Sequence, residues 1–269
     1  MRYPVVAGRF YEGEAEALRR QIDHCFLHPH GPGPLPKSGS RRSIVAALAP
    51  HAGYMASGPA AAHVYHAILA DGLPELYVLI GPGHTGSGAP VAASDEDFLT
   101  PLGVCETDRE AVSKLDGIVE VDRRAHMMEH SLEVQIPFIQ TIDPSPKIVA
   151  VVMNTQDPQS AVETARSLRK ASAGKDTLFI ASSDLSHYVP QARAEKDDMY
   201  LVERILALDV EGIYEAIAYR HISACGFGPI VAAILASKPS SAELLKYMTS
   251  GDMIPMNDVV GYAAVAFRR

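Results

Sequence analysis

The stretches SIVAALAPH (residues 43–51), LYVLIGPGH (76–84) and TLFIASSDLSH (177–187) each join an apolar run to a loop that carries a histidine. Continuous apolar runs of this kind are typical of strands that are buried on both faces of a sheet. Longer amphipathic stretches alternate with such runs, which indicates helices on both faces of that sheet. The sequence therefore predicts an α/β fold, as a single three-layer α/β/α domain with a central mixed sheet.

The remaining pattern extends this prediction over the whole chain. Strands are expected at 43–49, 76–80, 147–153, 177–181, 243–248 and 259–267, with a further short strand opened by Pro90. Helices are expected at 12–27, 58–70, 133–142, 158–173, 192–208, 211–220 and 228–237. Residues 1–42 read as an extended arm, a helix and a Pro/Gly-rich linker packed on the body, so we expect one domain over 1–269.

Composition narrows the classes of function. The chain has 24 Lys and Arg against 32 Asp and Glu, a net charge of -8, which argues against nucleic acid or an anionic membrane as a partner. The beginning of the chain lacks the pattern of a signal peptide, and no stretch has the length of a membrane span, so we expect a cytoplasmic protein. Only three cysteines occur, Cys25, Cys105 and Cys225, too few for a disulfide framework.

The histidine-bearing loops point to one pocket. His51 and His84 each follow a predicted strand, and Asp184 and His187 follow a third. In open α/β sheets ligands bind beyond the carboxyl ends of the strands, so these loops are expected to converge. His187 is a candidate general base, and Asp184 is either a metal ligand or the group that orients it.

Two further segments add candidates. Cys225 lies in ISACGFGP, just before the helix predicted at 228–237, where the helix dipole is expected to lower the pKa of the thiol. Glu129, His130 and Glu133 stand at the start of the helix predicted at 133–142. We expect His130 to line the pocket and Glu133 to have a structural role.

These residue types favour a transition metal. Two imidazoles and a thiolate suit iron, copper or zinc, and disfavour magnesium or calcium. If Asp184 were the third ligand instead of Cys225, the set would be two histidines and one carboxylate, as used by ferrous iron. The sequence leaves both ligand sets open.

Two other chemistries compete with a metal site. The glycines at 81, 83 and 86 match G-x-G-x-x-G, but Pro90 and a short strand follow instead of the helix that a dinucleotide site requires. No G-x-S-x-G elbow occurs, while a metal-free cysteine hydrolase built on Cys225 is retained as an alternative.

Six motifs in order carry a family resemblance: RYPVVAGRFY, PHAGY, GPGH, EHSLEVQIPF, SSDLSHY and ACGFGP. They resemble the MEMO family, whose archaeal and bacterial members are also described as AmmeMemoRadiSam system protein B. The resemblance implies a fold like that of class III extradiol dioxygenases. It also implies His51 and His84 as metal ligands, His187 as the catalytic histidine, and Cys225 in place of the dioxygenases' glutamate ligand, an exchange that counts against ring-cleaving activity.

Residues and resemblance together predict a metal-binding protein. We expect one transition metal ion, iron before copper or zinc, in a redox-type non-haem enzyme or metal handler with a small-molecule or peptide ligand. The alternative is a non-catalytic peptide- or protein-binding module that uses the same cleft. The family name further implies an association with radical-SAM and AMMECR-type proteins.

Overall fold

A mixed sheet runs through the centre of the computed structural model, which describes residues 1–269. The strand order is β10-β11-β1-β8-β2-β7-β3-β6. Its centre is parallel and consists of β1 (Ile44–Ala49), β8 (Thr177–Ser182), β2 (Leu76–Pro82) and β7 (Lys147–Met153). On each side of this centre the direction reverses, because β11 (Asp258–Arg268) is antiparallel to β1 and β3 (Val91–Ala93) is antiparallel to β7. The two outermost strands of the order are β10 (Ser241–Thr249), beside β11, and β6 (Val119–Val121), beside β3.

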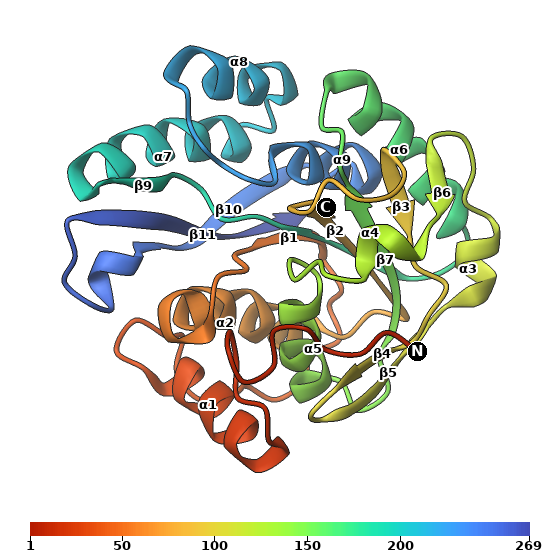
Figure 1. Ribbon diagram of the computed structural model, residues 1–269, viewed down its shortest axis with the longest axis horizontal. Helices are drawn as coiled ribbons and strands as arrows, with labels where there is room; N and C mark the ends of the chain where they lie inside the picture. Colours follow the sequence, from red (N-terminus) through yellow and green to blue (C-terminus); the bar gives the residue numbers. More distant parts are fainter.

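Helices cover both faces of this sheet (Figure 1). One face carries α1 (Ala15–Leu27), α2 (Tyr54–Asp71) and α5 (Ile136–Ile142); the other carries α6 (Pro158–Ala171), α7 (Gln191–Leu206), α8 (Val210–Arg220) and α9 (Phe227–Ser237). Neighbouring residues of a strand divide between the two cores, so that Ala47 packs on the first face and Ala46 on the second. The predicted three-layer α/β fold with a mixed sheet is confirmed.

All the predicted strands and helices are present, with differences at their ends. The helix predicted at 58–70 begins earlier, at Tyr54, so that Gly58 lies inside it, where the missing Cβ makes room for the Cys25 side chain of α1. The helix predicted at 133–142 begins as a 3-10 turn, Glu133–Gln135, before α5. The sequence did not indicate the short elements β4 (Phe98–Thr100), β5 (Gly103–Thr107), α3 (Arg109–Ser113), β6, α4 (Arg123–His126), β9 (His187–Pro190) and the 3-10 turn Ser250–Asp252.

The N-terminal arm is held by one buried carboxylate. Glu133 forms an ion pair with Arg2, and its oxygens accept hydrogen bonds from the backbone N–H groups of Val5 at 2.9 Å and Val6 at 3.1 Å. The Tyr11 hydroxyl donates to the same carboxylate at 2.6 Å. The arm therefore runs against the segment that precedes α5. In the whole fold, no helix has both the length and the apolar character needed to span a membrane.

Candidate metal centre

The site lies at the carboxyl ends of three adjacent parallel strands. His51 follows β1, Asp184 follows β8 and His84 follows β2, in each case two residues after the strand ends. Since β1 pairs with β8 and β8 pairs with β2, the three loops leave the same edge of the sheet side by side. Cys225 joins them from the loop that precedes α9.

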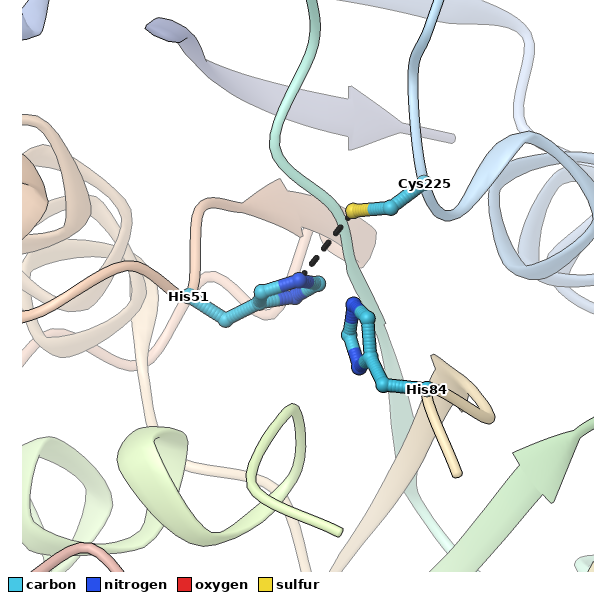
Figure 2. A group of neighbouring side chains, drawn as sticks. All are labelled: His51, His84 and Cys225. Atoms are coloured by element: carbon cyan, nitrogen blue, oxygen red, sulfur yellow. Dashed lines mark hydrogen bonds between the residues drawn. The ribbon is translucent and has the colours of Figure 1, made fainter. Parts of the chain in front are cut away.

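Three donor groups meet at this edge (Figure 2). The ligand atoms of His51, His84 and Cys225 all lie within 4.8 Å of one another, and the two imidazole rings are 5.2 Å apart at an interplanar angle of 87°. Donor atoms that share one tetrahedral ion at 2.0–2.3 Å are about 3.3–3.8 Å apart, so the widest pair would have to close by about 1 Å on binding. The geometry and the nitrogen and sulfur donor set both fit a single transition metal ion.

A hydrogen-bond network selects the tautomer of His51. The Ser182 hydroxyl donates to the carbonyl of Ser131 at 2.6 Å and accepts from the side-chain amide of Gln135 at 2.8 Å. With its proton used, Ser182 accepts from Nδ1 of His51, which lies 2.9 Å away. The lone pair of His51 is therefore on Nε2, which accepts from the Cys225 thiol at 3.1 Å and is free to bind a metal instead.

A carboxylate orients His84 in the same way, with Nδ1 as the nitrogen that carries the hydrogen-bonded proton. Its Nδ1 lies 2.9 Å from Oε1 of Glu129, and its backbone N–H donates to Oε2 at 2.6 Å. Burial opposes the charged imidazolium, but the hydrogen bond and charge of Glu129 outweigh it and raise the pKa of His84. Burial likewise opposes the Glu129 carboxylate, yet its bonds with His84 lower the pKa of Glu129 to about 2. The pair thus presents Nε2 of His84 toward His51 and Cys225 (Figure 2).

The prediction that the thiol of Cys225 is activated by a helix dipole is wrong. Helix α9 begins at Phe227, and burial, followed by the nearby Asp184 carboxylate, raises the pKa of Cys225. Burial also holds the pKa of His51 well below its ordinary value. In the metal-free protein the Cys225 and His51 pair is therefore neutral, and a metal would have to displace the proton of the thiol.

Asp184 lies beside the ligand group but has a different task. Its Oδ1 accepts from the backbone N–H groups of His51 at 2.7 Å and Ala52 at 3.3 Å, which fixes the loop after β1. Burial raises the pKa of Asp184 to about 6. Of the two ligand sets that the sequence left open, the structure brings together the one with Cys225.

The expected orientation of His187 by Asp184 is also wrong. Nδ1 of His187 lies 2.7 Å from the carbonyl oxygen of Leu185 and 2.8 Å from that of Ser223. Carbonyl oxygens only accept, so Nδ1 of His187 carries a proton, and in the neutral imidazole the lone pair is on Nε2. Backbone groups, rather than a carboxylate, set the tautomer of this histidine.

A pocket of about 290 Å³ opens beside His51 and His84, while Cys225 is not among its lining residues. The predicted residues His130, His187 and Asp184 all line it together with His51 and His84. His130 stacks on the ring of His84 at 4.5 Å, and burial, followed by the charge of His84, lowers its pKa. The apolar walls of the pocket come from Phe10 of the N-terminal arm and from Tyr188 and Val260. Such a volume suits a small molecule.

Sequence comparisons cover almost the whole chain. The sequence model of the family described as Memo-like protein matches residues 2–266. A MEMO1 family protein of Methanothermobacter thermautotrophicus is 44% identical over 273 residues, covering 98% of this chain and 99% of the relative. MEMO1 family proteins of Methanococcoides burtonii (46% identical, 98% of this chain and 99% of the relative) and Methanopyrus kandleri (44%, 100% and 99%) are similar in the same way.

A solved structure supports the fold independently of close sequence similarity. The crystal structure of an uncharacterized protein from Escherichia coli K12 superposes with a TM-score of 0.50 at 14% identity, covering 82% of this chain and 99% of that one. At this identity the likeness concerns the fold alone. The sequence matches carry the assignment further, and they show that the chain belongs to the Memo-like protein family.

Proposed function

We propose that this protein binds one transition metal ion through His51, His84 and Cys225 and uses it in redox-type chemistry on a small molecule. The observation that carries the proposal is the matched presentation of the two imidazoles. Separate networks protonate Nδ1 of each ring and turn each Nε2 toward the same thiol. Histidine ligands in metal sites are commonly oriented by such hydrogen bonds from the other ring nitrogen.

Iron is the metal we propose first, with copper or zinc as alternatives. A nitrogen and sulfur set favours these borderline ions over hard cations. When bound, the ion would supply Lewis acidity and, if it is iron or copper, redox chemistry. Cys225 supplies a thiolate where the extradiol dioxygenases have a glutamate, and a thiolate is itself open to oxidation. We therefore do not assign the ring-cleaving reaction of those enzymes to this protein.

The chain's own residues define the rest of the pocket. We assign His187 the role of general base, because its Nε2 lone pair is free and the residue lines the pocket. His130 is a second pocket imidazole, held neutral by burial, that is suited to donate or accept a hydrogen bond from the ligand. Asp184 acts as a positioning residue that holds His51 through its backbone.

Metal analysis of anaerobically purified protein tests the proposal. We expect about one ion per chain in the wild type and loss of that ion in a His51→Ala, His84→Ala double variant. A His24→Ala, His28→Ala variant is the matched control, since it also removes two histidines but at the linker end of α1. Equal metal content in the wild type and the His51, His84 variant would overturn the proposal.

A cysteine hydrolase is less well supported than a metal centre. The 3.1 Å contact of Cys225 with His51 resembles a nucleophile and base pair. Burial, however, raises the pKa of the thiol and lowers that of the imidazole, which opposes formation of the thiolate and imidazolium pair. Slow alkylation of metal-free Cys225 at neutral pH is therefore expected, and rapid alkylation would favour the hydrolase.

The other competing class is a binding module without chemistry. It predicts that a peptide or small acidic ligand binds equally well after a chelator has removed the metal and in the Cys225→Ser variant. The metal proposal predicts that the chelator and the substitution each remove binding in the pocket. The association with radical-SAM and AMMECR-type proteins stays a prediction from the family resemblance.

A further inference from the structure

Tyr188 has an unusual backbone conformation beside the proposed metal pocket. Its φ is 55°, in the left-handed region that bulky side chains rarely adopt. In the pairing of β9 with β11, Val189 faces Val259 and His187 faces Val260, so Tyr188 is the extra residue of a β-bulge. A bulge residue with left-handed backbone is usually glycine.

The other non-glycine residues with positive φ have ordinary explanations. His221 and Lys238 are the C-caps of α8 and α9, and Leu208 follows the C-cap of α7. Arg42 is tied down by Asp176, which its Nε and Nη2 contact at 2.7 and 2.8 Å. Tyr188 differs from all of these, because it ends no helix and its side chain is 78% exposed.

The bulge places two consecutive residues at one pocket. Successive residues of a regular strand point to opposite faces of the sheet. Here the consecutive residues His187 and Tyr188 both line the same pocket. The bulge therefore brings Tyr188, an exposed aromatic residue, to the pocket together with the proposed general base and the apolar residues Phe10 and Val260.

We propose that Tyr188 contacts the bound ligand and gives the pocket a preference for small molecules that carry a planar apolar group. This inference rests on the proposed metal centre. The backbone strain is maintained for the ring, since glycine would form the same bulge without strain and an exposed tyrosine adds no core packing.

Cobalt(II)-loaded protein, titrated with benzoate and with acetate and followed by the visible absorption of the metal, tests the proposal. Both probes offer the same carboxylate, and only benzoate carries a ring. We expect benzoate to bind more tightly than acetate in the wild type. In Tyr188→Gly the preference should fall by about two- to tenfold, the size of an aromatic pair interaction, with cobalt uptake unchanged.

Two further variants make the result specific. Tyr219→Ala removes an equally exposed tyrosine from α8, where the residue is 81% exposed, and should leave the benzoate preference intact. Tyr188→Ala should lose the preference like Tyr188→Gly but unfold at a lower temperature than it, because alanine retains the strained Cβ.

The outcomes separate this inference from the proposed function. An unchanged benzoate preference in Tyr188→Gly, with cobalt bound, would overturn the role of Tyr188 and leave the metal centre standing. A Tyr188→Gly protein less stable than Tyr188→Ala would overturn the strain argument on which the role depends. Failure of the wild type to bind cobalt would overturn the metal centre, and this inference with it.

Discussion

Glu129 and Glu133 lie four residues apart in the segment before α5, and both are buried, but they face different parts of the molecule. Glu129 accepts hydrogen bonds from Nδ1 and the backbone N–H of His84. Glu133 instead receives the N-terminal arm through Arg2 and Tyr11. One short segment therefore supports a candidate metal ligand at one residue and the fold at the other. The surroundings, rather than the residue type, decide which role each carboxylate has.

The largest expected effect is on stability, at the arm. Glu133→Gln leaves the guanidinium of Arg2 buried without its counter-charge, and removing one partner of a buried ion pair typically costs about 3–5 kcal/mol of unfolding free energy. Denaturant unfolding of the metal-free protein measures this cost. Glu16→Gln, which breaks an exposed pair with Arg19, is the matched control and should cost less than about 1 kcal/mol. Equal losses in the two variants would remove the distinction between the arm anchor and an ordinary surface pair.

The next effect is on metal affinity, at Glu129. Glu129→Gln removes the charge that orients His84, and changing such an outer partner typically weakens metal binding by about 10- to 100-fold. Competition with a chromophoric chelator measures the affinity. Glu133→Gln, compared under conditions where both variants are folded, should bind metal nearly as well as the wild type. Similar metal affinities in the two variants would break the contrast.

A smaller effect is expected at the other candidate histidine ligand, His51. Ser182→Ala removes a neutral acceptor from Nδ1 of His51, so the loss of metal affinity should lie near the lower end of that range, at about tenfold. The same chelator competition applies. A larger loss in Ser182→Ala than in Glu129→Gln would show that the hydroxyl network, and not the carboxylate, dominates ligand orientation.

The smallest expected effect is a change in the pKa of His84 in the metal-free protein. Burial lowers its pKa but Glu129 more than compensates, so His84 should titrate above the usual 6.5, and below it in Glu129→Gln. Because the folded-state pKa is raised, the stabilisation from this pair is fully present below pH 6.5 and is lost as the pH rises through the folded pKa. NMR of the imidazole resonances measures the shift. A His84 pKa that is unchanged by Glu129→Gln would contradict the assignment.

The sequence predicted the features that depend on short local patterns of residues. Continuous apolar runs identified the parallel centre of the sheet, and their positions placed His51 and His84 at strand ends. The supporting partners were missed because they come from elsewhere: Glu129 is 45 residues from His84, and Ser182 is 131 residues from His51. The presence of Glu129 directly before His130 in a predicted pocket segment was the one available signal.

Local reasoning also failed where burial decides the chemistry. A helix start near Cys225 suggested a lowered thiol pKa, but burial, followed by the nearby Asp184 carboxylate, reverses the sign. The position of Asp184 three residues before His187 suggested that the carboxylate orients the ring, whereas the chain turns so that carbonyl groups do so. The bulge at Tyr188 depends on pairing with β11, more than 70 residues away, and no local pattern marks it.

X-ray absorption spectroscopy of the metal-loaded protein tests the central claim most directly. The donor set of His51, His84 and Cys225 predicts two imidazole nitrogens and one sulfur around each ion, with the sulfur at about 2.3 Å if the ion is zinc. The sulfur contribution should disappear in Cys225→Ser while both imidazole contributions persist. A spectrum of the wild type with oxygen and nitrogen donors only, unchanged by Cys225→Ser, would contradict the account.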